Sequence, residues 1–486
     1  MDEEIETTHT DDVCDCPNAA KLKQFVTNSP QFYDHPRSIY KCRLSFLKEL
    51  SHTTYPFHSR RVASNLIIEG ELMKKLLVLG GGTSGSMIVN KLHKKLSSKE
   101  WSITIVDKNN DHLYQPGLLF LPFGSYRAKD LIKKRDSFFP KGVIYIEAEI
   151  DLVEPEKNTV KLMDGRTLEY DQLVIASGAS PRPDQTPGLE DPNIWYKSAF
   201  DFYTLEGSAA LAKALENWPG GRLVIHITEM PIKCPVAPLE FAFLADAFFE
   251  KRKMRDKVEI VYVTPLEGAF TKPVCSEKLG YMLNNRKITL EPDFIIDHVD
   301  PLAKAIVSMD EREIPFDLLV TVPLNMGQEY IARSGLGNEL NYVPVDKETF
   351  LSNKYSNIFA LGDASDIPAS KAGSVAHFAV DMFADNFMKH IEGRKMDELF
   401  DGHANCFIES GHGKGLLIDF NYTVEPLTGK FPIPVIGPLP LLKESHLNHW
   451  GKLAFRWIYW NLLIKGRKIP ISSHMSMAGK IQNTKK

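Results

Sequence analysis

Short apolar runs alternate with amphipathic stretches along most of this chain. The run KKLLVL, from Lys74, is followed by a glycine-rich turn and then by apolar residues at helical spacing, and the run WSITIVD ends at Asp107. Apolar runs bounded by turn residues predict buried strands, and a period of about 3.6 residues predicts an amphipathic helix. Strands that alternate with helices are typical of doubly wound α/β domains.

The same alternation returns after a Trp-Pro-Gly turn at residues 218–220. The run RLVIHIT, a helix expected from Ala237 and the run VEIVYVTP make up a second α/β unit. Two further strands, YDQLVIASGA from Tyr170 and NIFALGDAS from Asn357, stand before and after this unit. The order predicts two Rossmann-like dinucleotide-binding domains, with the second inserted into the first, so that the first is discontinuous.

Composition narrows the range of functions. The chain has 486 residues, is 43% hydrophobic and carries a net charge of −4, which is typical of a folded multidomain protein and excludes disorder or a disulfide scaffold. A near-neutral charge argues against nucleic-acid binding. No run of about eighteen residues is free of charge and proline, so we expect no transmembrane helix, and no signal peptide is visible.

The small net charge hides a difference between the two ends. The first 16 residues hold seven acids and no base, whereas the stretch from Lys443 to the end holds nine bases and one acid, Glu444. A basic end is either a solvated tail or a surface attracted to anionic lipid. The charges alone leave both interpretations open.

A G-x-G-x-x-G motif lies between the first strand and the first helix. Gly80 permits the turn, Gly82 lets the backbone approach a pyrophosphate, and Gly85 lets helix and strand pack closely. The helix N-terminus would face the phosphate charge. Asp107 ends the next strand, where a carboxylate bonds ribose hydroxyls, although an aspartate there is also a common turn residue.

The second α/β unit lacks the corresponding glycines. Residues 228–231 read Thr-Glu-Met-Pro, and no glycine occurs from Arg222 to Ala247. Prolines and bulky side chains block close approach of a phosphate and remove N–H donors. We therefore expect no nicotinamide dinucleotide in the usual position. A cysteine, Cys234, stands instead at the carboxyl end of the strand, where α/β folds place chemistry.

Two pairs of motifs carry a family resemblance. ASGA, with Gly178, and ALGDAS, with Gly362 and Asp363, resemble the paired FAD motifs of the disulfide-reductase superfamily. The segments HITEMPIKCPVAPLEF, around Cys234, and NCFIESGHGKG, around Cys406, resemble the two redox-cysteine segments of sulfide:quinone oxidoreductases. The resemblance extends from about residue 73 to residue 466, and it implies bound FAD with Asp363 at the ribityl chain.

The family resemblance also implies a reaction and its residues. Hydrosulfide would attack a sulfur bridge between Cys234 and Cys406, one cysteine would keep a persulfide, and the other would pass electrons through the flavin to a quinone. Sulfur would leave as polysulfide or on an acceptor. Glu240, six residues after Cys234, could move protons there, or be a solvated helix residue.

Further segments of the resemblance add cofactor residues. YQPGLLFLPFG, with Gln115, resembles the loop beside the flavin, and KAGSVAHFAVDMFADN, with Lys371 and Gly373, resembles the last FAD-binding helix. Three features depart from the family pattern. Residues 188–203 hold no third cysteine, Ala364 stands where eukaryotic-type members have their second cysteine, and residues 270–271 lack a histidine. Covalent flavin attachment and the sulfur product therefore stay open.

The stretch LNHWGKLAFRWIYWNLLIKG, from Leu447, predicts an amphipathic helix. Lys452 and Arg456 share one edge, and three tryptophans lie on the broad apolar remainder. Such a helix either packs on a core or lies in a membrane interface, and the resemblance favours a monotopic membrane helix. The same resemblance makes Phe455 a quinone-stacking residue and Lys452 a polar partner of the quinone.

These patterns divide the chain into five segments. We expect a flexible N-terminal extension, two parts of an FAD-binding domain, an inserted Rossmann-like domain with Cys234, and a quinone- and membrane-binding region with Cys406. We expect no metal site, because Cys14-x-Cys16 has one intervening residue, fewer than zinc sites use. The extension covers residues 1–72, and the two parts of the FAD-binding domain cover 73–184 and 340–400. The inserted domain with Cys234 covers 185–339, and the region with Cys406 covers 401–486.

The leading hypothesis is a peripheral membrane FAD enzyme with sulfide and quinone as substrates, attached through its C-terminal region. The cytoplasmic face is favoured because no signal peptide is visible, and the oligomeric state stays open. A type II NADH:quinone oxidoreductase is disfavoured by the missing second glycine motif, and a flavocytochrome c sulfide dehydrogenase by the missing signal. A flavin-binding sulfur carrier or persulfide sensor would keep reactive cysteines without reducing quinone.

Overall fold

The computed structural model describes residues 73–433 and 437–481. The chain divides into two compact units, residues 1–69 and 70–486, and every described residue belongs to the second. The predicted N-terminal extension 1–72, with Cys14, Cys16 and Cys42, lies outside the described residues.

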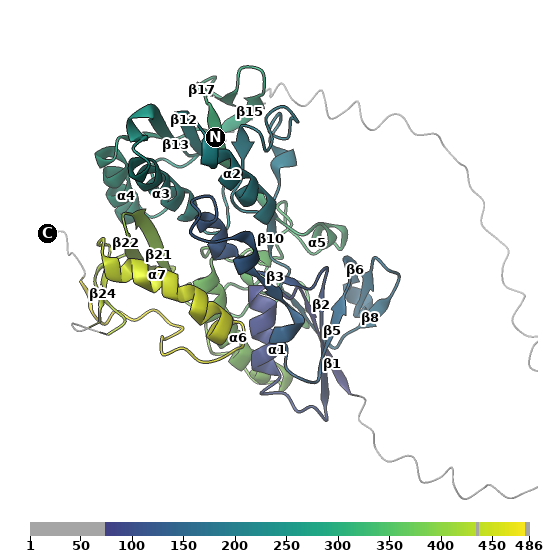
Figure 1. Cartoon of the computed structure of the whole chain (residues 1–486). Coiled ribbons are helices and arrows are strands. Elements are labelled where there is room, and N and C mark those ends of the chain that lie inside the picture. The colour runs from purple at the N-terminus through teal and green to yellow at the C-terminus, as the bar shows by residue number, and fades with distance from the viewer. Residues whose placement is uncertain (1–72, 434–436, 482–486) are drawn as a thin grey trace, which may run out of the picture. The chain divides into compact units, whose positions relative to one another are not determined.

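The first α/β unit is a five-stranded parallel sheet with the order β20-β9-β1-β2-β5. Its central strands are almost wholly buried, as the continuous apolar runs predict. Helices α1 and α6 lie side by side against this sheet (Figure 1). The elements are β1 (Lys74–Leu79), α1 (Thr83–Leu92), β2 (Trp101–Asp107), β5 (Val143–Glu147), β9 (Gln172–Ile175), β20 (Ile358–Ala360) and α6 (Gly373–Ile391).

The second α/β unit contains another five-stranded parallel sheet, with the order β11-β18-β12-β13-β14. All its strands fall between β9 and β20 in the sequence, so the predicted fold of two Rossmann-like units, one inserted into the other, is confirmed. The elements are β11 (Ala199–Phe200), α2 (Leu205–Asn217), β12 (Gly221–Ile227), α3 (Ala237–Lys251), β13 (Val258–Val263), α4 (Pro273–Asn285), β14 (Ile288–Glu291) and β18 (Leu318–Val322).

Smaller elements, mostly short antiparallel strands, are added to the two α/β units. They are β3 (Asp111–Leu113), β4 (Ile132–Lys134), β6 (Ile150–Glu154), β7 (Thr159–Leu162), β8 (Thr167–Glu169), β10 (Ala179–Pro181), β15 (Ile296–Asp300), β16 (Ala305–Ser308), β17 (Glu313–Pro315), β19 (Asn325–Gly327) and the short helix α5 (Glu329–Arg333). A 3₁₀ segment, Gln115–Phe120, covers part of the site described below.

The C-terminal region is built on a β-hairpin and a helix. Strands β21 (Ala404–Gly411) and β22 (Lys414–Phe420) pair antiparallel, and α7 (His446–Ile458) packs against both (Figure 1). The Ser445 hydroxyl accepts the N–H of Asn448 at 3.1 Å and so caps α7. A π-helical turn, Tyr459–Leu463, follows directly. A small sheet completes the region, formed by β23 (Thr428–Phe431), β24 (Leu439–Leu441) and β25 (Lys480–Ile481).

The last described strand is fixed to the hairpin by buried charges. Asp419 on β22 pairs with Lys480 at 2.6 Å and with the ring of His403 at 2.7 Å, and all three side chains are almost inaccessible. The same carboxylate accepts the side-chain amide of Asn405 at 3.1 Å. Because Asn405 precedes Cys406, the end of the chain helps to fix the strand that carries the second predicted redox cysteine.

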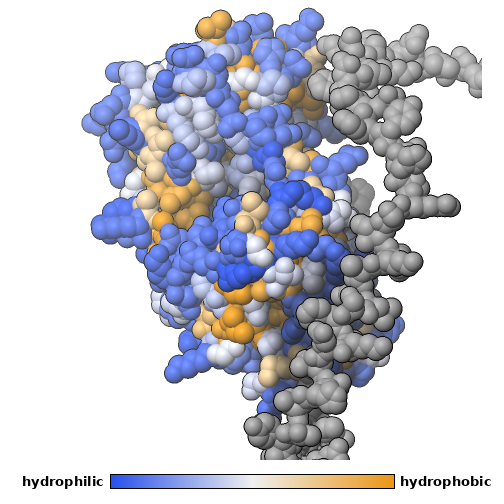
Figure 2. Space-filling view, turned by 90° about the vertical axis from the view of Figure 1, so that its right-hand side faces the viewer, coloured by the Kyte–Doolittle hydropathy of each residue, from blue (hydrophilic) through white to orange (hydrophobic). Residues whose placement is uncertain are grey.

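The surface is mainly polar with scattered apolar patches, as one face shows (Figure 2). The outer side of α7 is apolar, with Leu447 43%, Trp450 61%, Leu453 38% and Trp457 62% exposed. Within residues 73–433 and 437–481, no helix combines the length and apolarity needed to cross a bilayer.

Candidate active site

The turn after β1 has the shape of a dinucleotide-binding turn. Gly80 has φ +99°, and a Cβ there would lie 2.5 Å from the Cα of Ser177, so only glycine fits. A Cβ on Gly85 would lie 1.8 Å from the carbonyl oxygen of Gly80. Gly82 differs, since a Cβ there would meet no atom within 4 Å. The motif therefore leaves space at the N-terminus of α1, which has no side-chain cap.

Asp107 lies beside this turn at the end of β2. Its Oδ2 atom accepts the backbone N–H of Gly81 at 2.7 Å and pairs with the guanidinium of Arg135. Arg135 also donates to the carbonyl of Asp111 at 2.7 Å and is buried. Arg135 could not be singled out from the sequence, because it lies in a loop without a motif. Asp107 is placed as a ribose-binding residue needs to be, and that role stays a prediction.

The predicted FAD residues from the later segments lie on the same side of the first sheet. Gly178 and Gly362 both have positive φ, 69° and 65°, at the ends of β9 and β20. Lys371 donates from Nζ to the carbonyls of Asp363 and Ser365, at 3.1 and 2.8 Å. Burial lowers the pKa of Lys371 to about 8, so the loop before α6 holds a lysine that is charged at neutral pH but loses its proton at mildly alkaline pH.

A second lysine, Lys233, lies near Gln115 and was not predicted. Its Nζ donates to Oε1 of Gln115 at 3.2 Å, and its side chain is buried. Burial lowers its pKa, while the charge of Asp363 opposes that change. Lys233 could have been suspected from its position before Cys234.

At the N-terminus of α6, Gly373 leaves open space, since a Cβ there would meet nothing within 4 Å.

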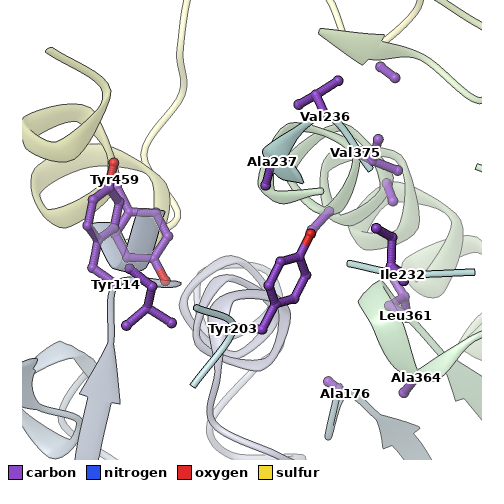
Figure 3. Close-up of a cluster of buried hydrophobic side chains, with 14 of the residues drawn as sticks. Tyr114, Ala176, Tyr203, Ile232, Val236, Ala237, Leu361, Ala364, Val375 and Tyr459 are labelled. Atoms are coloured by element: carbon purple, nitrogen blue, oxygen red, sulfur yellow. The ribbon is translucent and has the colours of Figure 1, made fainter. Parts of the chain in front are cut away.

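The C-terminal segment packs a tyrosine against the glycine turn. Tyr114 and Tyr459 lie with ring centroids 4.9 Å apart, and both are buried (Figure 3). The hydroxyl of Tyr459 is 2.8 Å from Oγ1 of Thr83, the first residue of α1, and 2.7 Å from Nε2 of His112. Residues far apart in the sequence thus meet beside the glycine turn.

Cys234 lies in the turn between β12 and α3. Its backbone has φ 45°, its N–H donates to the carbonyl of Lys371 at 2.7 Å, and its carbonyl accepts the hydroxyl of Tyr203 at 3.1 Å. The turn that carries no glycines therefore presents a cysteine to the loop before α6. Cys406 lies on β21, next to Ser374 at the start of α6.

The two cysteines are partly buried free thiols. Burial raises the pKa of Cys234 to about 12 and that of Cys406 to about 11. Each of these pKa values also responds to the charge of Glu240, which raises it, and of Lys452, which lowers it. The charge of Cys406 also raises the pKa of Cys234, so the fold places the two cysteines near each other, although 171 residues lie between them in the sequence.

Glu240 and Lys452 form a buried ion pair beside the thiols. Nζ of Lys452 is 2.7 Å from Oε1 of Glu240, whose side chain is fully buried. Burial raises the pKa of Glu240, and the Lys452 ammonium opposes this. The interpretation of Glu240 as a solvated helix residue is thus wrong. Lys452, which the helical wheel places on a basic edge, is only 13% exposed, because its side chain points toward Glu240.

Two further residues extend this group, and neither could be singled out from the sequence. The backbone N–H of Glu409 donates to Oε1 of Glu240 at 2.7 Å. The Glu409 carboxylate is buried and contacts Nδ1 of His449 at 2.9 Å. Both residues line a cavity of about 1120 Å³. Its other walls include Phe123, Tyr126, Leu244, Phe248, Leu453 and Arg456.

Three side chains near the cavity belong to residue types that bind metal ions. Asp246, Glu250 and His412 each place one ligand atom within 4.8 Å of the others. Asp246 is already bound by Arg255 at 2.6 Å, so the group is explained as a set of ion pairs. The structure gives no reason to assign a metal to these three residues.

Known proteins resemble this chain over most of its length. The family model for pyridine nucleotide-disulphide oxidoreductases matches residues 74–215. The mitochondrial sulfide:quinone oxidoreductase of Dictyostelium discoideum is 27% identical over 401 residues, which are 81% of this chain and 86% of that protein. The chain is a relative of the sulfide:quinone oxidoreductases. The mouse mitochondrial enzyme of the same name is 24% identical, with the same coverage.

A solved sulfide:quinone oxidoreductase shows the same fold. The structure from Aquifex aeolicus has a TM-score of 0.67 at 21% identity, covering 81% of this chain and 92% of that one. At this identity the likeness concerns the fold alone. The family resemblance predicted from the two cysteine segments is confirmed by these relatives, which are enzymes.

The glycine turn fits the flavin cofactor that the family implies. The open space at Gly82, the uncapped N-terminus of α1 and the small residues at the strand ends suit a pyrophosphate and its flavin. Gly80, Gly82, Gly85 and Asp107 would hold the nucleotide half, and Gln115, Gly178, Gly362, Asp363, Lys371 and Gly373 the flavin half. The role of each residue stays a prediction.

Proposed function

We propose that this protein is an FAD-dependent sulfide:quinone oxidoreductase with Cys234 and Cys406 as its redox pair. The observation that carries the proposal is that the charges of the buried Glu240–Lys452 pair act on the pKa of both cysteines, and that the N–H of Cys234 is bonded to the carbonyl of Lys371. The comparisons with sulfide:quinone oxidoreductases support it.

The reaction begins from a sulfur bridge between Cys234 and Cys406. Hydrosulfide adds to one sulfur, which becomes a persulfide, and the other cysteine leaves as a thiolate. A second anion, either a thiolate or another hydrosulfide, takes the outer sulfur and leaves a second thiolate. Re-forming the bridge from the two thiolates releases two electrons, which a flavin held by residues such as Gln115, Lys371 and Gly373 would accept and supply to quinone. The reactants are one hydrosulfide, one acceptor anion, one quinone and two protons. The products are one hydropersulfide and one hydroquinone.

The surroundings of the thiols suit this sequence. Burial disfavours each thiolate, so a thiolate that leaves the bridge needs a nearby positive charge. Lys452 supplies that charge, since it lowers the pKa of both cysteines. Glu240 balances Lys452 when the thiols are uncharged and is placed to exchange a proton with the centre.

The inserted unit supports sulfide rather than NADH as the electron donor. The turn after β12 holds Lys233 and Cys234 in place of the glycines that a pyrophosphate needs. A type II NADH:quinone oxidoreductase is therefore the weaker hypothesis. The hypothesis of a flavin-binding sulfur carrier or persulfide sensor differs from the main proposal in that such a protein would not reduce quinone, and the experiment below distinguishes the two.

The proposed test is anaerobic mixing of the flavin-loaded protein with sulfide, followed by a short-chain quinone. Flavin absorbance should bleach with sulfide and return with quinone. Bleaching by NADH but not by sulfide would contradict the proposal. Bleaching by sulfide without recovery on quinone would identify a carrier or sensor instead.

We also propose that α7 attaches the protein to the membrane that holds the quinone. Trp450 and Trp457 are exposed on one side of α7, and Leu447 and Leu453 add to the apolar surface. Tryptophan at a helix surface suits the membrane interface. Phe455 and Lys452, on the inner side of the same helix, would then meet a quinone that arrives from the lipid.

The double variant Trp450→Ser and Trp457→Ser should bind lipid vesicles more weakly. We expect a loss of about 10-fold or more in the partition coefficient, because two large apolar surfaces leave the interface. Sedimentation with vesicles that contain anionic lipid measures the effect. The matched control is Leu302→Ser with Met309→Ser, both exposed apolar residues of the inserted unit. Equal losses in both variants would contradict attachment through α7.

A further inference from the structure

The segment that follows α7 is bonded to α1, the helix of the glycine motif. Near its start, the hydroxyl of Tyr459 lies 2.8 Å from Oγ1 of Thr83, the first residue of α1. Further along, Nδ2 of the buried Asn90 in α1 donates to the carbonyl of Ile464 at 3.0 Å. The C-terminal region is therefore attached both to the start of α1 and to a later turn of the same helix.

The hydroxyl of Tyr459 lies in a closed, mostly aromatic environment. Tyr459 is 1% exposed, and so is His112, whose Nε2 lies 2.7 Å from the Tyr459 hydroxyl. The rings of Phe138 and Trp460 pack against His112, with ring centroids 5.6 and 5.5 Å from its own. Because water has little access there, the Tyr459 hydroxyl is bonded to two side chains, His112 on one side and Thr83 on the other.

The state of His112 sets the direction of these hydrogen bonds. Burial and the charge of Arg135 lower the pKa of His112 to about 3, against the effect of the Gly81 carbonyl, so the ring is neutral. Its Nδ1 is buried without a hydrogen-bond partner among the described residues. A buried N–H without an acceptor is less favourable than a lone pair without a donor, so the proton belongs on Nε2. Nε2 then donates to Tyr459, Tyr459 donates to Thr83, and the hydroxyl proton of Thr83 is left to bond another acceptor.

We propose that Tyr459 is a positioning residue for the cofactor, which holds the Thr83 hydroxyl so that it donates to the pyrophosphate of FAD. Thr83 directly follows the open space at Gly82, and it is itself partly exposed. A hydroxyl donor fixed at this point adds to the free N–H groups at the start of the helix. The inference rests on the proposed function, because it takes FAD as the cofactor. It gives the C-terminal region a part in holding FAD, in addition to its proposed part at the membrane.

The test measures FAD binding to flavin-free Tyr459→Phe, which keeps the ring and loses the hydroxyl. We expect the Kd for FAD to rise about 3- to 10-fold, because the bond from Thr83 to a charged group is no longer directed. Flavin fluorescence titration and the rate of FAD release measure the effect. The matched control is Tyr262→Phe in β13, since Tyr262 is also fully buried and its hydroxyl has no partner within the described part of the chain. This control should bind FAD as the unchanged protein does.

A double-mutant cycle with Thr83→Val separates positioning from a general structural role. Valine has nearly the shape of threonine but no hydroxyl, so Thr83→Val should lose at least as much affinity as Tyr459→Phe. In the double variant, Tyr459→Phe should then change the Kd by less than about 2-fold, because no hydroxyl is left to direct. Phosphorus NMR of bound FAD is a second measurement. The pyrophosphate signals should shift in Tyr459→Phe and stay in place in Tyr262→Phe.

Two further comparisons keep the inference open to refutation. Thr83→Ser retains the hydroxyl and should bind FAD nearly as the unchanged protein does, so an equal loss in Thr83→Ser and Thr83→Val would overturn the inference. Unchanged FAD affinity in Tyr459→Phe would overturn it as well, and so would additive losses in the double variant, since Tyr459 would then act without Thr83. Failure of the unchanged protein to bind FAD would instead contradict the proposed function.

Discussion

Replacing either Cys234 or Cys406 by serine should abolish the bleaching of the flavin by sulfide while the flavin stays bound. Serine has nearly the same size, so the turn before α3 and strand β21 should keep their shape. It cannot form a sulfur bridge, however, and a hydroxyl is no leaving group for hydrosulfide. We expect the bleaching rate to fall by about 1000-fold or more in each variant, as when one member of a catalytic unit is removed.

The measurement is stopped-flow absorbance of the flavin after anaerobic mixing with sulfide. Cys275→Ala is the matched control, because Cys275 is fully buried in α4, and burial and the charge of Cys406 both raise its pKa, so it is a third thiol in the same region. This control should bleach at the unchanged rate. Full bleaching in both serine variants would refute the pair, and loss in Cys275→Ala would show that a third thiol takes part.

Local patterns were enough to predict the sheets and the glycine turn. A strand, a turn and a helix that follow one another in sequence also meet in space, so Gly80, Gly82 and Gly85 could be interpreted without the fold. The two cysteine segments were found by family resemblance, and the structure brings these segments together. The role of each site residue stays a prediction.

The buried charges could not be predicted from their own segments. A helical wheel of α7 places Lys452 beside Arg456 on a polar edge, because it contains no information on what packs against that edge. In the structure, α3 and β21 cover it, and Glu240, from 212 residues earlier, becomes the partner of Lys452. Glu409 and His449 were missed for the same reason, because their contact depends on the packing of β21 against α7, which neither segment reveals by itself.

Gly82→Glu should give a protein that folds but no longer binds FAD. The backbone at Gly82 has φ −71°, which any residue adopts, and a Cβ there meets no atom within 4 Å. A carboxylate at the N-terminus of α1 is also favourable for the helix. The new side chain would fill the space that we assign to the pyrophosphate and would repel its charge. We expect a loss of at least about 3 kcal/mol in binding, or about 100-fold in Kd.

The measurement is flavin fluorescence titration of the flavin-free variant, with its thermal unfolding recorded alongside. Gly82→Ala should bind FAD with little change, because it adds one methyl group to open space. Gly85→Ala should behave in the opposite way, since its Cβ would lie 1.8 Å from the carbonyl of Gly80 and must disturb the packing of α1 on β1. If Gly82→Glu binds FAD as tightly as the unchanged protein, the pyrophosphate does not lie at this turn, and the cofactor site must be placed elsewhere.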